Sequence, residues 1–249
     1  MHSDGDQSVD QLAGAAAARG LDFLAVTDHN TTSHWSEMGA AGQRYGISLL
    51  PGQGVTTHRG HANAFGEIGF VDFREPVATW IEQVEKAGGV LSANHPLSQD
   101  CAWLPEELPP VLELWHIEWF LGLHHTAPWT LLWRWPAGTP VIGGSDFHTP
   151  SQGYPPGTPT TWVLASECTT EALLEGVRLG RTAISRSPTP DCPVLLRLAD
   201  QLWAVDADGC VLVDQKDRRR VIHGDRVRLP APAGRCRLEA ADRGLLAIA

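Results

Sequence analysis

The fold of this chain is decided by the stretch Leu21-Asp22-Phe23-Leu24-Ala25-Val26-Thr27-Asp28-His29-Asn30. Its first six residues are mostly apolar, which is the pattern of a buried strand. Asp28 and His29 come directly after that strand. Functional groups collect at the carboxyl ends of strands in α/β sheets and barrels. The stretch therefore predicts a functional site where this strand ends.

Four further stretches place His or Asp beside a predicted strand or a tight turn. They are Ser3-Asp4-Gly5, Gly60-His61-Ala62-Asn63, Ala93-Asn94-His95-Pro96 and Gly143-Gly144-Ser145-Asp146-Phe147-His148. Neutral imidazole and carboxylate oxygen together suit zinc, manganese or iron(II) better than calcium. A single His of this kind is more often structural, but a repeated strand-end pattern favours a metal site in which several ions lie within bridging distance.

Helices and strands alternate along residues 1–186. A helix starting at Ser8, with Gln11 as capping-box partner, precedes the strand at 21–27, and Gly20 suits its end. Later helices are expected at 34–44, 76–86, from 128 and at 169–179, and strands at 47–50, 55–57, 62–70, 90–93, 112–120, 140–143, 161–164 and 182–184. The alternation predicts a parallel α/β fold, and the strand count favours a barrel whose first strand should precede Ser3.

The composition changes at Ser187-Pro188-Thr189-Pro190. Short β-like runs follow at 194–198, 202–206, 210–214, 220–223, 226–229, 235–239 and 245–248. Asp208-Gly209 is typical of a turn between such strands. We therefore expect a barrel domain at 1–186 and a small antiparallel β appendage at 187–249 without a catalytic constellation of its own.

Charge and cysteine usage exclude several classes of protein. The formal net charge is -10 and there is no basic stripe, which argues against a nucleic-acid partner. No apolar run approaches the ~18 residues of a membrane span. Five cysteines lie far apart without a C-x-x-C motif. They indicate reduced thiols in a cytoplasmic protein rather than a disulfide framework or a thiolate metal site.

The order of motifs resembles the PHP (polymerase and histidinol phosphatase) family, and most closely its carbaryl-hydrolase-like branch. The motifs are Ser-Asp-Gly, Thr-Asp-His-Asn, Pro-Gly-x-x-Val-Thr-Thr, Gly-His-Ala-Asn-Ala-Phe-Gly, Asn-His-Pro and Gly-Ser-Asp-Phe-His, all within residues 1–186. The resemblance implies a distorted (β/α)7 barrel that here lacks its first strand. It also implies hydrolysis of a small-molecule phosphoester or related ester by a metal-activated water, with one to three divalent ions (Zn, Mn or Fe).

The resemblance also assigns roles to individual residues. Asp4, His29 and His148 match the ligands of one metal. His95 and Asp146 match ligands of the other two. His61 falls on a strand-end histidine that would bind metal or contact substrate. Catalysis would then involve Asp146, His95 and His61. Arg59 would meet an anionic substrate, with a solvent-facing Arg as the alternative.

Two features of the family pattern are missing. The family begins with a strand ending in His-x-His, whereas this chain starts Met1-His2-Ser3-Asp4. Where the family has a bridging Glu this chain has Gly54, and the neighbouring Gln53 would point to the opposite face of a strand. Three explanations stay open: a start codon assigned too late, a PHP-like pseudoenzyme that serves as a binding module, and an enzyme that uses fewer ions.

Overall fold

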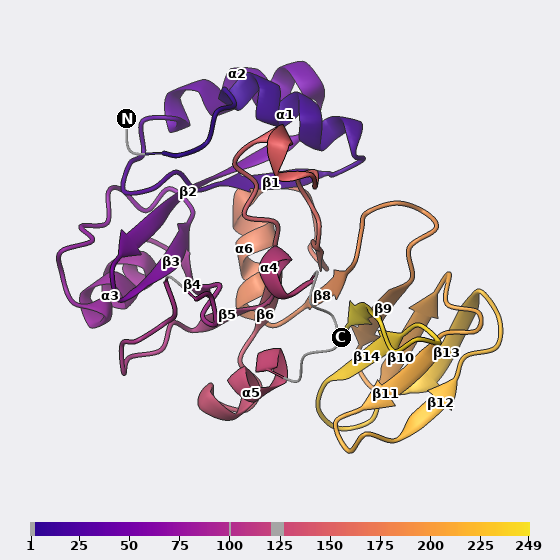
Figure 1. Cartoon of the computed structure of the whole chain (residues 1–249). Helices are drawn as coiled ribbons and strands as arrows, with labels where there is room; N and C mark the ends of the chain where they lie inside the picture. The colour runs from indigo at the N-terminus through magenta and orange to yellow at the C-terminus, as the bar shows by residue number, and fades with distance from the viewer. Residues whose placement is uncertain (1–2, 100, 121–126) are drawn as a thin grey trace.

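The computed structural model describes residues 3–99, 101–120 and 127–249 (Figure 1). The helices are α1 Val9–Ala18, α2 Trp35–Tyr45, α3 Val77–Lys86, α4 Ile117–Phe120, α5 Ala127–Arg134 and α6 Thr170–Arg178, with a short 3-10 helix at Pro150–Gln152. The strands of the first part are β1 Phe23–Val26, β2 Ser48–Thr57, β3 Gly60–Phe65, β4 Val90–Asn94, β5 Val111–His116, β6 Val141–Gly144, β7 Thr160–Val163 and β8 Thr182–Ser185. Those of the tail are β9 Val194–Leu198, β10 Gln201–Val205, β11 Val211–Asp214, β12 Arg219–Val221, β13 Arg226–Pro230, β14 Cys236–Glu239 and β15 Leu245–Ile248.

The first six strands form one curled sheet in the order β1-β2-β3-β4-β5-β6. β1 and β2 are parallel, β2, β3 and β4 are antiparallel, and β4, β5 and β6 are parallel. The α/β class is therefore confirmed. The sheet is mixed and curls as a half-barrel, so the finer expectation of a (β/α)7 barrel is not established.

Three boundaries within this sheet differ from the prediction. β2 runs unbroken through Pro51 and Gly52, because Pro51 uses only its carbonyl, which accepts a hydrogen bond from the Gly66 N–H at 2.7 Å. β3 ends at Phe65 rather than at residue 70. The predicted strand 112–120 is β5 followed directly by the helical turn α4.

The first helix follows its sequence signals closely. The Gln11 N–H donates to the Ser8 hydroxyl at 3.2 Å and the Ser8 N–H donates to Gln11 at 2.9 Å, which completes the predicted capping box. Gly20 follows with a φ of 76°, as a helix end requires. α1 and α2 lie together over β1 (Figure 1). Their buried faces form a core cluster around Ala13, Val26 and Met38, which fixes the strand that leads to His29.

The tail is an antiparallel β unit, as predicted. One sheet has the order β13-β10-β9 and the other β12-β11-β14-β15-β8-β7. The second sheet crosses the expected boundary near residue 186, because β15 pairs with β8 through Ala247 with Ser185 and Ile248 with Ile184. The tail also contacts α5, where the Arg237 guanidinium lies 5.1 Å from the centroid of the Trp129 ring. The division at residue 186 stays a prediction.

β1 lies at one end of the six-stranded sheet, and its outer edge, which pairs with none of the described strands, borders a cavity of about 1110 Å³. All residues from Gly20 to His29 line this cavity, so the strand exposes its backbone edge and not merely one face. Apolar side chains of Ile142 and Val163 line the other side. The expectation that a further strand precedes Ser3 stays a prediction. In the described ranges, no helix has the length and apolarity that a membrane crossing requires.

Candidate metal centre

Five histidines form a continuous row, and His29, His61, His95 and His148 among them line the cavity. Ring centroids are 6.2 Å apart for His148 and His29, and 5.5 Å for His29 and His61. They are 4.9 Å apart for His61 and His95, and 5.1 Å for His95 and His116. Four of these residues are predicted ligands, and they come from segments that are far apart in the sequence. The curled sheet therefore assembles the predicted histidines into one site.

Asp4, His29 and His148 form the first group of potential ligands, with donor atoms within 4.8 Å of one another. Asp4 Oδ1 lies 3.4 Å from His29 Nε2 and 3.1 Å from His148 Nε2. The Asp4 side chain is 66% exposed, so this group opens to solvent. These are the three residues that the family resemblance assigns to one metal; the structure brings them together, and their metal role stays a prediction.

Hydrogen bonds at the far ring nitrogens orient both histidines of this group. His148 Nδ1 lies 2.7 Å from the carbonyl oxygen of Asp146, which fixes a hydrogen on Nδ1. His29 Nδ1 contacts the Thr56 hydroxyl, which itself lies 3.5 Å from the Gly54 carbonyl. Both Nε2 atoms thereby face Asp4 Oδ1. Such outer hydrogen bonds are typical of metal-ligating histidines.

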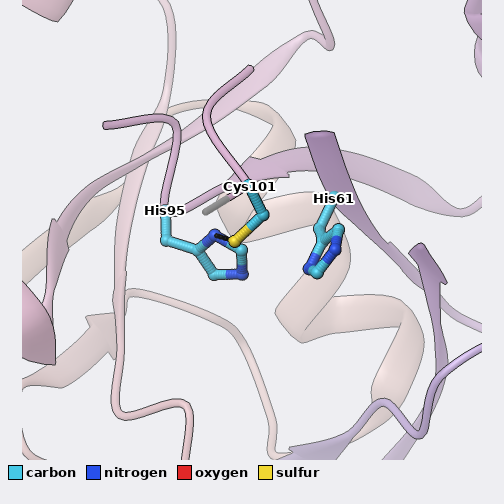
Figure 2. Close-up of side chains that lie close together, drawn as sticks. All are labelled: His61, His95 and Cys101. Carbon is cyan, nitrogen blue, oxygen red and sulfur yellow. Dashed lines mark hydrogen bonds between the residues drawn. The ribbon is translucent and has the colours of Figure 1, made fainter. Parts of the chain in front are cut away.

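His61 and His95 form a second group together with Cys101. His61 comes from β3, His95 follows β4, and Cys101 lies in the loop after it (Figure 2). Cys101 Sγ is 3.3 Å from His95 Nδ1. The buried Nδ1 of His61 has no hydrogen-bond partner among the described residues. A buried donor or acceptor without a partner is costly, and a bound ligand would remove that cost.

Asp146 lies between His148 of the first group and His116. Its Oδ1 is 3.8 Å from His148 Nε2, and its Oδ2 is 3.4 Å from His116 Nε2. Burial would raise the pKa of Asp146, but the hydrogen bond and charge of His116, with His148 and His95, lower it well below the usual value. Burial would lower the pKa of His116, but the carboxylates of Glu113 and Asp146 raise it. The centre thus holds an ionised carboxylate at Asp146.

Glu113 holds the backbone of His95 in the second group. Its Oε2 accepts a hydrogen bond from the His95 backbone N–H at 2.6 Å. Burial raises the pKa of Glu113 to about 6, although the nearby His116 opposes the rise. Burial, followed by the charge of His116, lowers the pKa of His95 to about 4. A side chain at Gly144 would collide with the Glu113 carboxylate, so that glycine leaves room for it.

Three strand-end residues have left-handed backbone conformations. The φ angles are 50° at Asn30, 26° at His95 and 46° at Asp146. Non-glycine residues rarely adopt such angles, and they persist only where surrounding contacts hold them. The Asn30 side chain is tied to Thr56 by hydrogen bonds of 2.9 and 3.0 Å, and Glu113 holds the peptide of His95. The sheet therefore imposes the orientation of the site residues.

Gly54 lies where the chain after β1 runs against β2. The Asn30 N–H donates to the Gly54 carbonyl at 2.7 Å, and the Gly54 N–H donates to the Asp28 carbonyl at 3.1 Å. A Cβ at Gly54 would lie 2.7 Å from the carbonyl oxygen of Thr27. No side chain fits here without a backbone shift. Gly54 is thus a packing requirement of this chain, and its correspondence to a bridging Glu stays a prediction.

Other expected residues lie elsewhere. Arg59 is exposed on the turn between β2 and β3 and does not line the cavity, so its substrate role stays a prediction. His116 is the last residue of β5, and Glu118 lies in α4. His124 and His125 lie outside the described residues.

Glu113, His116 and Cys101 extend the site beyond the residues that the sequence assigned to it. Glu113 interrupts the otherwise apolar run of a buried strand, which is a signal that sequence reasoning could have used. Cys101 follows His95 by six residues in a loop, and no periodicity marks it.

The comparisons with known proteins concern this fold. A structure from Bacteroides vulgatus, described as a two-domain protein containing a predicted PHP-like metal-dependent phosphoesterase, has a TM-score of 0.61 and 18% identity, covering 98% of this chain and 90% of that chain. An amidohydrolase from Chromobacterium violaceum, solved with bound sulfate and no metal, has a TM-score of 0.45 and 20% identity over 61% of this chain and 87% of that chain. The second likeness is too weak to add to the account of the fold. No family model and no curated protein sequence matches the chain. The chain therefore shares its fold with the two-domain Bacteroides protein.

Proposed function

We propose that this chain is a PHP-like metal-dependent hydrolase that acts on small-molecule phosphoesters or related esters. The observation that carries the proposal is the convergence of Asp4, His29, His61, His95 and His148 in the lining of a single cavity, with the Asp146 carboxylate beside His148. The motif order supports the PHP-like class, and the shared fold with the Bacteroides protein is consistent with it.

The donor set fits divalent metal ions. Imidazole nitrogen with carboxylate oxygen is a set that zinc, manganese and iron(II) accept. Asp4, His29 and His148 would hold one ion, and His61 and His95 would contribute to a second position. Bound ions of this kind polarise a phosphoryl or carbonyl group and lower the pKa of water, which is the chemistry that ester hydrolysis needs.

The remaining residues of the site act by positioning. His116 holds the Asp146 carboxylate, and the Asp146 carbonyl in turn orients His148. Glu113 fixes the backbone of His95. The described lining of the cavity contains no Lys or Arg, so bound ions alone would neutralise an anionic phosphoester there. This feature leaves uncharged aryl esters and carbamates as competing substrates.

A second candidate function is a metal-binding module without turnover. The observation that favours it is Gly54, which offers no ligand atom at the position of the expected bridging Glu and is closely packed against Thr27. Metal binding would then serve recognition or folding rather than chemistry.

Turnover assays separate these candidates. The purified chain, loaded in turn with zinc, manganese or iron(II), would be assayed on an aryl phosphate, an uncharged aryl ester and an aryl carbamate. We expect hydrolysis of at least the phosphate, abolished by a chelator. Asp146→Asn should lower kcat/KM by about 100-fold or more, because an aligned carboxylate in a catalytic site contributes at this scale. The exposed Asp200→Asn is the matched control. Metal binding without turnover of any of the three substrates would favour the binding module.

A further inference from the structure

We propose that Cys101 is a metal ligand, so that His61, His95 and Cys101 form a thiolate-containing site beside the Asp4–His29–His148 site. The inference rests on the proposed metal-dependent function and specifies its second metal position. Sequence spacing argued against a thiolate site because no second cysteine lies near Cys101 in the chain. The fold supplies two imidazoles instead.

The distances suit tetrahedral zinc. The donor atoms of His61, His95 and Cys101 all lie within 4.8 Å of one another. With zinc bonds of about 2.3 Å to sulfur and about 2.0 Å to nitrogen, a tetrahedral site places the two donors about 3.5 Å apart. The observed separation of Cys101 Sγ and His95 Nδ1 is 3.3 Å. Figure 2 shows the three side chains directed toward one another.

The loop that carries Cys101 is built into the sheet. The Ser98 N–H donates to the His95 carbonyl at 2.8 Å, and the Leu104 N–H donates to the Arg59 carbonyl at 2.9 Å. Between them, Trp103 is 2% exposed and packs so closely on Gly60 that a Cβ there would lie 3.0 Å from its ring. These contacts fix the loop on the β2–β3 turn and place the sulfur beside the two histidines.

Two buried polar atoms independently point to a ligand at this position. His61 Nδ1 is buried without a hydrogen-bond partner among the described residues. Asn94 is 8% exposed, and its Oδ1 is likewise without a partner in the described part of the chain. His61 and Asn94 are directly paired across β3 and β4, so their side chains lie on the same face of the sheet, and both line the cavity.

The donor types give the two positions different metal preferences. No Asp or Glu among the described residues joins the Cys101 group at these distances, which leaves one soft sulfur and two nitrogens. Thiolate and imidazole select zinc over manganese, whereas the carboxylate of Asp4 accepts either ion. We expect zinc or cobalt(II) to fill both positions and manganese to fill only the Asp4–His29–His148 position.

Cobalt(II) absorption tests the sulfur bond directly in the full-length chain. The wild type and the control Cys168→Ser, which removes an exposed thiol, should show a thiolate-to-cobalt charge-transfer band in the near ultraviolet. Cys101→Ser should lose the band and bind the second cobalt about 100-fold more weakly or worse, since even outer partners of ligands contribute 10–100-fold. His29→Ala should lose one cobalt and keep the band.

X-ray absorption of the zinc-loaded wild type provides a readout without any substitution. It should show a sulfur neighbour at about 2.3 Å from zinc. Two bound ions without a sulfur neighbour, or a band that survives in Cys101→Ser, would overturn the assignment. Turnover without the band would leave the proposed hydrolase standing and remove Cys101 from the site. The band without turnover would support Cys101 as a ligand and refute the proposed hydrolase.

Discussion

Replacing Gly54 by Ala tests whether the β1–β2 contact sets the position of His29. The added Cβ would lie 2.7 Å from the Thr27 carbonyl oxygen, whereas ordinary contact begins at 3.4 Å. The backbone must therefore move by about 0.7 Å, and inserting one carbon into a packed interior typically costs about 1–3 kcal/mol. Thr27 precedes Asp28 and His29 directly, so the same movement displaces a metal ligand.

The assay is urea unfolding of the metal-free chain together with a metal titration of the Asp4–His29–His148 site. If unfolding is followed by heating instead, a loss of 1 kcal/mol in the free energy of unfolding lowers Tm by about 2–4 °C for a chain of this size. The matched control is Gly39→Ala, on the exposed face of α2, where a Cβ would meet nothing within 4 Å. That substitution should stabilise the chain by about 0.5–1 kcal/mol, since alanine favours helix.

A Gly54→Ala variant as stable as the wild type would refute the packing role of Gly54. A variant that is less stable but binds metal with unchanged affinity would refute the link to His29, because His29 would then be positioned independently of Gly54. The Cβ of Gly54→Glu meets the same carbonyl. We expect that substitution to destabilise the chain rather than to supply a bridging carboxylate.

Three further predictions concern the stability of the chain. Glu113→Ala should lower the free energy of unfolding, measured in urea, by about 1–3 kcal/mol, because it leaves the buried His95 N–H without its acceptor. Glu113→Gln retains an acceptor oxygen and should lower it by less than half as much. Arg237→Ala should lower the free energy of unfolding by about 1–3 kcal/mol, since it removes the Trp129 contact and a 2.6 Å ion pair with buried Glu239. The control Arg220→Ala, at an exposed position, should stay within about 0.5 kcal/mol of the wild type. Metal removal by a chelator should lower thermal stability. A free ion at 100 times its Kd should raise the free energy of unfolding by about 2.7 kcal/mol for each site that it fills. His29→Ala should lack the contribution of one site.

The sequence predicts much of the fold because its strongest signals are local. The Ser8–Gln11 capping box, the apolar run ending at Val26 and the turn at Asp208-Gly209 each depend on neighbouring residues, and each gives the expected element. Sheet topology depends on pairings between distant segments. Periodicity alone gives no strand direction, so the antiparallel β2–β3–β4 arrangement and the pairing of β8 with β15 were not predicted.

The candidate site likewise has residues that local sequence signals predict and residues that they do not. His29 and His95 follow predicted strands, so their convergence follows from the pattern. His61 lies instead near the start of β3, which reaches the same end of the sheet because β3 runs antiparallel to β4 and pairs His61 with Asn94. Cys101 reaches the site only because its loop is fixed on the β2–β3 turn, which no local pattern reveals. The packing role of Gly54 depends on the approach of a neighbouring backbone and requires coordinates.

Elemental analysis of the purified chain shows whether it binds metal at both positions. The two ligand groups predict about two zinc ions per chain after reconstitution with zinc and removal of unbound metal. His29→Ala should retain about one zinc ion, and a variant combining His29→Ala with His95→Ala should retain almost none, while each variant keeps the secondary structure of the wild type. Wild-type protein that is folded and holds no stoichiometric zinc, manganese or iron would contradict the account.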